Sequence, residues 1–218
     1  DLSAVKIEVP VIPPTFYAAG LNYVEHVKEG AARRGETPNI PAKPDMGYRA
    51  ANALIAHGET VVIPADAPEK VHYEGEIGVV VGKKAKHLSE EDALSCLLGW
   101  TIGNDVSERT WQKADRTFWR SKNTDTFKPM GPWIETDLDL DAAETIVRLN
   151  GEVRTRFATN HMLFGVAKFI ATMTRNITLH PSAEADIHML RFTEHLLASA
   201  IGAASSRLVL SLLLRRGN

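Results

Sequence analysis

The chain has 218 residues, of which 44% are apolar, and a formal net charge of −2 at neutral pH. This length is typical of one domain with a substantial core, and the near-zero charge offers no basic surface for nucleic acid or an anionic membrane. The single cysteine, Cys96, excludes an intramolecular disulfide framework. With no secretory leader and no apolar segment long enough to cross a membrane, the sequence predicts a cytoplasmic protein without a membrane or nucleic-acid partner.

The first elements along the chain are predicted to be short. Residues 1–14 contain three prolines and are expected to form an extended connector. A short helix is predicted over residues 23–29, with Gly30 ending it. On that helix His26 and Glu29 are three residues apart and can touch, an arrangement that is also common on ordinary helix surfaces.

The stretch from His72 to Gly82 begins with polar residues and ends with β-branched ones, which is typical of a strand. Residues two apart project from the same face, so Glu74 and Glu76 point the same way, about 7 Å apart along the chain. Gly75 between them adds no bulk and allows a close approach to the backbone. Neighbouring carboxylates repel each other unless a cation or a proton lies between them. We interpret the pair as half of a metal site, the alternative being a solvated strand face.

A Ser-x-x-Asp capping pattern at residues 89–92 predicts a helix that ends at Gly99. Its core-facing residues are expected to be Leu94, Leu97 and Leu98. Cys96 lies in the same apolar run without a flanking basic residue or histidine, so we interpret it as core packing rather than a nucleophile. The remaining predicted elements are strands at residues 60–64, 100–105 and 131–136, a loop at residues 35–49, a hairpin from residue 145 with an Asn-Gly turn at residues 150–151, and a helix at residues 160–174 with apolar side chains at helical spacing.

Asp105 ends an apolar strand where a polar turn begins. It is interpreted either as a cap for that turn or as a third oxygen ligand beside Glu74 and Glu76. Three carboxylates without cysteine or paired histidines suit a hard cation such as Mg²⁺ or Mn²⁺. They leave about three octahedral positions for water or substrate, which is typical of a catalytic site. Lys122 lies in a loop that nearby aromatic residues and a Pro-Met-Gly-Pro turn are expected to anchor.

Five motifs, taken together and in order, resemble the fumarylacetoacetate hydrolase family over about residues 16–180. They are Gly-Leu-Asn-Tyr-Val-Glu-His (20–26), Tyr-Glu-Gly-Glu with Val-Val-Gly (73–82), Thr-Ile-Gly-Asn-Asp-Val-Ser-Glu-Arg-Thr-Trp-Gln (101–112), Ser-Lys-Asn-Thr-Asp-Thr-Phe with Pro-Met-Gly-Pro-Trp (121–133) and Leu-Asn-Gly-Glu-Val-Arg (149–154). The resemblance implies an α+β fold that is mainly β, a mixed β-sandwich roll with a few short helices. It also implies a homodimer with the site at one mouth of the roll.

The resemblance further assigns roles to the matching residues. It implies metal ligands Glu74, Glu76 and Asp105, a water-activating dyad of His26 and Glu29 on a mobile lid, Lys122 as the group that stabilises an enolate, and Arg109 and Gln112 as substrate-binding residues. The implied cofactor is Mg²⁺ or Mn²⁺, with Ca²⁺ as a substitute in crystals, and the implied partner is a small oxo acid.

The leading functional hypothesis is a divalent-metal-dependent hydrolase that cleaves a C–C bond in an acylpyruvate or 1,3-diketo acid. In this mechanism the His/Glu pair activates water and the metal stabilises the enolate. The alternative within the enzymes is an isomerase or decarboxylase of a 2-hydroxy-dienedioate or oxaloacetate-like acid in aromatic catabolism. An inactive ligand-binding or dimerising relic is the alternative of another class. A phosphate-handling enzyme is disfavoured because no glycine-rich loop opens a helix.

Residues 15–218 are expected to form one catalytic domain of this family, but residues 182–218 depart from the family pattern. After Leu-His-Pro (179–181) the family continues with Gly-Asp, a strand and a Thr-Gly-Thr loop, whereas this chain becomes rich in Ala, Ser and Leu. A helical tail and a shifted reading frame are the two interpretations of this segment. If the tail is genuine, one wall of the site is missing and activity is in doubt.

Overall fold

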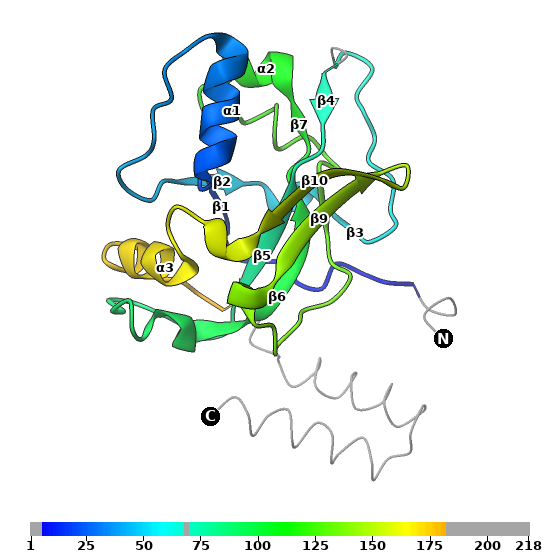
Figure 1. Cartoon of the computed structure of the whole chain (residues 1–218). Helices are drawn as coiled ribbons and strands as arrows, with labels where there is room; N and C mark the ends of the chain where they lie inside the picture. Colours follow the sequence, from blue (N-terminus) through cyan, green and yellow to red (C-terminus); the bar gives the residue numbers. More distant parts are fainter. Residues whose placement is uncertain (1–5, 68–69, 182–218) are drawn as a thin grey trace. The chain divides into compact units, whose positions relative to one another are not determined.

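The strand pair β5–β6 forms the centre of the fold (Figure 1). The computed structural model describes residues 6–67 and 70–181, and the statements below concern those residues. The strands are β1 (Phe16–Ala19), β2 (Met46–Arg49), β3 (Leu54–Ala56), β4 (Val71–His72), β5 (Gly75–Val81), β6 (Leu97–Asn104), β7 (Ser107–Glu108), β8 (Lys128–Met130), β9 (Glu144–Leu149) and β10 (Glu152–Ala158). The α-helices are α1 (Val24–Arg34), α2 (Arg109–Ala114) and α3 (Val166–Thr174).

The largest sheet among these residues has the strand order β3-β8-β6-β5. β3 and β8 run parallel, whereas β6 is antiparallel to both β8 and β5, so the sheet is mixed. β1–β2, β4–β7 and β9–β10 form two-stranded antiparallel sheets. This arrangement of mixed sheets with a few short helices confirms the predicted α+β fold.

The β9–β10 hairpin packs on β5 (Figure 1). Its turn residues Asn150 and Gly151 both have positive φ, 53° and 83°, which confirms the predicted type I′ turn. A Cβ added to Gly75 would lie 2.6 Å from Val147 Cγ2. The predicted close approach to the Gly75 backbone is therefore confirmed, and the approaching group is the β9 strand.

A cluster of buried apolar side chains lies beyond the end of the strand pair where β5 finishes and β6 begins. It fills the space between the short 3₁₀ turn Ala93–Cys96 and α3. Its buried members are Ala85, Ala93, Cys96, Ile170 and Leu179. Cys96 is a buried free cysteine whose pKa is raised by burial, so the prediction of core packing is confirmed. α3 contributes the buried residues Phe169, Ile170 and Ala171, as its apolar spacing indicated.

The predicted helix over residues 89–99 is wrong. The Ser89 hydroxyl accepts a hydrogen bond from Asp92 N at 3.1 Å, so the capping interaction exists. Only a 3₁₀ turn follows it, because the chain becomes extended at Leu97 and pairs with β5. Leu94 and Leu98 are 49% and 50% exposed instead of facing the core.

The first predicted helix is too short. α1 continues through Gly30 and ends before Gly35, which has φ 69° and donates to Ala31 O and Ala32 O. A glycine within a helix costs only about 1 kcal/mol, whereas the left-handed position after a helix favours glycine strongly. The structure therefore ends the helix at Arg34, five residues after the predicted end at Glu29.

Four other elements differ from the predictions. β2 lies inside the predicted loop 35–49, and no strand forms at residues 60–64, where Val62 N bonds instead to the Thr126 hydroxyl. Residues 131–136 form only an isolated bridge instead of the predicted strand. β8 ends before them at Met130, because Gly131 has φ 125° and Pro132 has no N–H for a ladder. α3 begins at Val166 rather than residue 160, after a separate 3₁₀ turn. The expectations for residues 182–218 lie outside the described residues.

Candidate metal centre

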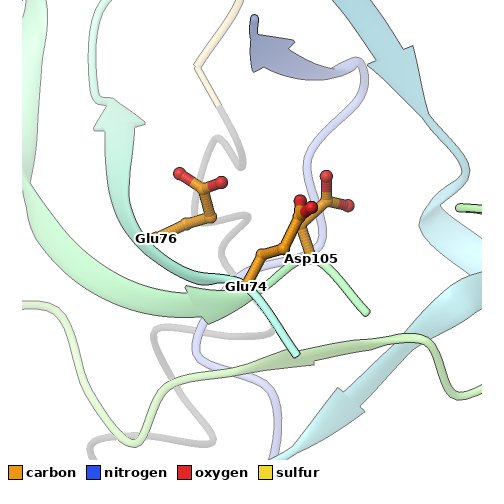
Figure 2. A group of neighbouring side chains, drawn as sticks. All are labelled: Glu74, Glu76 and Asp105. Carbon is orange, nitrogen blue, oxygen red and sulfur yellow. The ribbon is translucent and has the colours of Figure 1, made fainter. Parts of the chain in front are cut away.

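Three carboxylates meet at the end of the strand pair where β5 begins and β6 finishes (Figure 2). Glu74 precedes β5, Glu76 lies in it, and Asp105 follows β6. The two chain segments are joined by hydrogen bonds from Asp105 N to Glu74 O at 2.9 Å and from Glu74 N to Asn104 Oδ1 at 3.0 Å. One oxygen from each acid lies within 4.8 Å of the others. The structure therefore brings together the three predicted metal ligands.

Asp105 is surrounded by basic side chains. Arg49 binds it with two contacts, Nε to Oδ1 at 2.9 Å and Nη2 to Oδ2 at 2.8 Å. Lys128 Nζ lies 2.8 Å from Oδ1 and Lys122 Nζ lies 2.7 Å from Oδ2. Burial alone would raise the pKa of Asp105, but the Arg49 hydrogen bonds and the lysine charges outweigh it and hold this pKa well below its ordinary value. Asp105 is therefore a fixed carboxylate.

The two lysines on Asp105 differ in their remaining hydrogen-bonding capacity. Lys128 Nζ also donates to Val106 O at 3.0 Å and Phe127 O at 2.9 Å, so all three N–H groups of its ammonium are used. Burial lowers the pKa of Lys128 to about 8. Lys122 Nζ contacts only Asp105 Oδ2 and Glu74 Oε2, at 2.7 and 2.6 Å, among the described residues. Lys122 thus keeps one donor for a further group.

The loop that carries Lys122 is anchored, as predicted. Lys122 N donates to Phe118 O at 3.1 Å, and its side chain is only 6% exposed. The preceding residue, Ser121, donates its N–H to Asp115 Oδ2 at 2.8 Å. Because backbone and side chain are both held, the ammonium position is well defined.

The predicted substrate-binding residues lie on α2, next to the carboxylates. Arg109 Nη2 forms an ion pair with Glu74 Oε1, Nη1 donates to Gln112 Oε1 at 2.9 Å, and Nε donates to His72 Nδ1 at 3.3 Å. Arg109 and Gln112 therefore form one unit that touches the candidate metal centre. Their contact with substrate stays a prediction.

The predicted dyad lies on α1. His26 and Glu29 are both exposed, while Val27 and Ala31 bury the opposite face of the helix. Glu29 Oε2 accepts a hydrogen bond from Arg33 at 3.2 Å. In the described structure His26 and Glu29 are not hydrogen-bonded to each other. The water-activating role of this pair stays a prediction.

Glu76 is the acid that best indicates a cation. It has no hydrogen-bond or ion-pair partner within the described part of the chain, and loss of hydration together with the charges of Asp105 and Glu74 raises its pKa to about 8. Glu76 is nevertheless an exposed residue, so the hydration loss is incomplete and the charges of its two neighbours carry the direction of the shift. Lys122 shows that a positive charge is accommodated between Glu74 and Asp105. An all-oxygen donor set with one unpaired acid fits a hard divalent ion.

Sequence reasoning missed Arg49 and Lys128. Arg49 lies in a predicted loop, 56 residues before Asp105, and Lys128 lies in an unremarkable position before Pro129. Neither position has a local pattern that indicates its partner, because ion pairs across such separations arise only from the tertiary fold.

Three carboxylates at the ends of two paired strands, beside a lysine with one unused N–H, define a candidate divalent-metal enzyme of α+β fold. A family model described as the C-terminal part of fumarylacetoacetate (FAA) hydrolase matches residues 15–183. The chain therefore belongs to the fumarylacetoacetate hydrolase family, in agreement with the five motifs.

Known relatives add detail. Protein Rv2993c of Mycobacterium tuberculosis is 34% identical over 183 residues, which is 83% of this chain and 66% of that protein. The oxaloacetate tautomerase YisK of Bacillus subtilis is 32% identical over 184 residues, 82% of this chain and 60% of the relative. The crystal structure of 5-carboxymethyl-2-hydroxymuconate delta-isomerase from Mycobacterium smegmatis has a TM-score of 0.73 and 35% identity, covering 83% of this chain and 69% of that one. The family thus includes named tautomerases and isomerases.

No helix in the described part of the chain has the length and apolarity needed to span a bilayer.

Proposed function

We propose that this protein is a Mg²⁺-dependent tautomerase or isomerase that interconverts the keto and enol forms of a small 2-oxo dicarboxylic acid. The observation that carries the proposal is the position of Lys122, which is held between Glu74 and Asp105 with one N–H to spare. A tautomerase needs such a fixed charge where an enolate forms, and it needs no hydrolytic water. The names of two relatives support the same reaction class.

Each part of the candidate centre has a role in this reaction. A divalent ion held by Glu74, Glu76 and Asp105 would act as a Lewis acid that polarises the carbonyl of the oxo acid. Lys122 would donate its remaining N–H to the developing enolate oxygen, and His26 would accept the proton that leaves the α-carbon and return it in the reverse direction. Arg49 and Lys128 would keep the Asp105 carboxylate in one orientation throughout.

The charge of the centre favours a multiply charged anion. Four basic side chains contact the cluster of three acids, namely Arg49, Arg109, Lys122 and Lys128. With all three acids ionised, the positive charges exceed the negative ones by one, and a divalent ion would raise the excess to three. A dicarboxylate substrate would offset two of these charges, and Arg109 and Gln112 would receive one of its carboxylates.

Hydrolysis of an acylpyruvate is the second candidate. It is favoured by the spacing of His26 and Glu29 on one face of α1, where the carboxylate could orient the imidazole toward water. It requires Glu29 to exchange its bond with Arg33 for one with His26. Because Glu29 is bonded to Arg33 and not to His26 in the described structure, we rank hydrolysis below tautomerisation.

Activity assays with two substrates distinguish tautomerisation from hydrolysis. With oxaloacetate and Mg²⁺, a tautomerase accelerates the decay of enol absorbance without releasing CO₂. With acetylpyruvate, a hydrolase yields acetate and pyruvate, which chromatography detects. The Glu76→Gln variant should lose either activity, whereas Glu25→Gln, which changes an exposed acid on α1, should keep it. No acceleration of either reaction by the full chain would refute the proposal.

We further propose that the protein is a homodimer and works in the cytoplasm. These proposals follow from the family resemblance and the composition. Light scattering of the purified chain measures the first, and fractionation of cells that produce it measures the second.

A further inference from the structure

Glu108 is a buried acid that the proposed function does not use. It is 0% exposed and lies in β7, directly before α2. Its Oε2 accepts a hydrogen bond from Trp111 N, whereas its Oε1 has no partner among the described residues. Burying a carboxylate with one oxygen unpaired is unfavourable. An acid at this position therefore calls for a compensating role.

The Glu108 hydrogen bond fixes the beginning of α2. This helix has only six residues, so its first turn depends on its cap rather than on helix propagation. The same turn carries Arg109 and Gln112, which are joined at 2.9 Å. Arg109 N is also held by Lys70 O at 2.9 Å. The orientation of the Arg109–Gln112 pair thus depends on the cap that Glu108 provides.

Glu108 is also connected to the Lys122 segment. Glu108 N donates to Ser121 O at 2.9 Å, immediately before Lys122. Arg109 and Lys122 both contact Glu74, from α2 and from the loop respectively. Glu108 is therefore connected to the segments that carry two of the four basic side chains at the candidate metal centre.

We propose that Glu108 is a positioning residue that orients the Arg109–Gln112 pair to receive a carboxylate of a small dicarboxylate ligand. This inference rests on the proposed function, because it specifies which residue prepares the anion-binding side of the same site. Glu108 acts through Trp111 N and the first turn of α2, and it touches neither the ion nor the reacting atoms.

The inference separates anion binding from metal binding. Glu74 is held by Asn104 Oδ1 and by Asp105 N, and Asp105 is held by Arg49 and Lys128. None of these contacts involves α2, which touches the three acids through the Arg109–Glu74 ion pair. Loss of the Glu108 cap should therefore weaken anion binding far more than it weakens the affinity for Mg²⁺.

The test compares Glu108→Ala, Glu108→Gln and the matched control Asp139→Ala. Asp139 caps a 3₁₀ turn through Asp141 N at 3.1 Å, so its loss removes a comparable cap elsewhere. Calorimetry measures oxalate binding in the presence of Mg²⁺ and, separately, Mg²⁺ binding. Glu108→Ala should weaken oxalate binding and raise KM for oxaloacetate by about tenfold, with Mg²⁺ affinity within about twofold of the parent. Glu108→Gln retains an acceptor for Trp111 N and should behave like the parent, as should Asp139→Ala.

Three outcomes would overturn the inference: unchanged oxalate affinity in Glu108→Ala, an equal loss of oxalate and Mg²⁺ affinity, or no oxalate binding by the parent chain. If Glu108→Ala does not fold, Glu108→Leu is used, because its side chain fills much of the same buried space and offers no acceptor to Trp111 N. Parent-like oxalate affinity in Glu108→Leu would likewise refute the inference. Oxalate binding that depends on Glu108 without turnover of any oxo acid would support the inference and refute the proposed reaction.

Discussion

The β5–β6 strand pair has two ends with opposite character. Where β5 begins, Glu74, Glu76 and Asp105 lie together, and four basic side chains contact Glu74 or Asp105. Beyond the other end, Val81 and Leu97 pack against a cluster of buried apolar residues that includes Cys96. One antiparallel ladder, from Gly75–Asn104 to Val81–Leu97, joins the two ends.

The difference shows how stability and chemistry are divided along the same two strands. Burial of apolar area stabilises a fold by about 25 cal/mol per Å². The attraction within a buried ion pair, by contrast, often only offsets the free-energy cost of removing its two charges from water. The apolar end therefore contributes the stability that holds the polar end in place. Substitutions at the polar end should change binding and rate, and those at the apolar end should change the free energy of unfolding.

The largest effect is expected for Glu76→Ala at the polar end. Loss of this candidate ligand, which has no partner among the described residues, should reduce Mg²⁺-dependent turnover by about a thousandfold, since a Lewis acid contributes several kcal/mol. The melting temperature should not fall, because Glu76 is exposed and the substitution relieves its repulsion from Asp105 and Glu74. Calorimetry with Mg²⁺ and thermal denaturation measure the two quantities. A large drop in melting temperature would contradict the claim that the polar end contributes to binding and rate but not to stability.

The reverse result is expected for Ile170→Ala at the apolar end. Ile170 is buried in the cluster, and its truncation should lower the free energy of unfolding by about 3 kcal/mol. Chemical denaturation measures this loss, with Ile170→Val as the graded control at about 1 kcal/mol. Mg²⁺ affinity of the folded protein should equal that of the parent, and a parallel loss of affinity would contradict the comparison.

The His26→Gln substitution tests whether a residue of α1 takes part in the reaction at the polar end of the strand pair. In a tautomerase we expect a decrease in kcat of about tenfold, since proton transfer is only one part of the catalysis. A decrease beyond about a thousandfold would favour water activation and hence hydrolysis. Lys28→Gln serves as the control, because Lys28 lies on the same helix and pairs only with Glu25 among the described residues.

The smallest effect is expected for Ser89→Ala near the apolar end. The Ser89 hydroxyl bonds to Asp92 N at 3.1 Å and to Asp92 Oδ2 at 3.0 Å, but the turn is exposed. Its loss should cost about 0.5 kcal/mol or less in the free energy of unfolding. A cost above about 2 kcal/mol would mean that this turn belongs to the stabilising core.

The acids could be predicted from the sequence because strands alternate their faces. That period places Glu74 and Glu76 together, and a strand ending in Asp105 supplies the third oxygen. The roles of Lys122 and Arg109 came from the family resemblance, and the structure places both against Glu74.

What could not be predicted depends on contacts between distant segments. Arg49 reaches Asp105 across 56 residues, and such pairing leaves no periodic pattern. The Ser-x-x-Asp capping pattern at residues 89–92 indicated a helix, yet the pairing of Leu97 and the following residues with β5 decided the local structure. Glu108 was indistinguishable from an exposed acid, because its burial follows from the packing of β7 against β4 and the Lys122 loop.

Gly75 has a consequence for how the sequence can change over time. Val147 fills the space that a Cβ at position 75 would occupy, and Glu74 and Glu76 flank that position. A side chain at position 75 becomes admissible only together with a smaller residue at position 147. In an alignment of relatives, these two positions should therefore vary as a correlated pair, although 72 residues separate them along the chain.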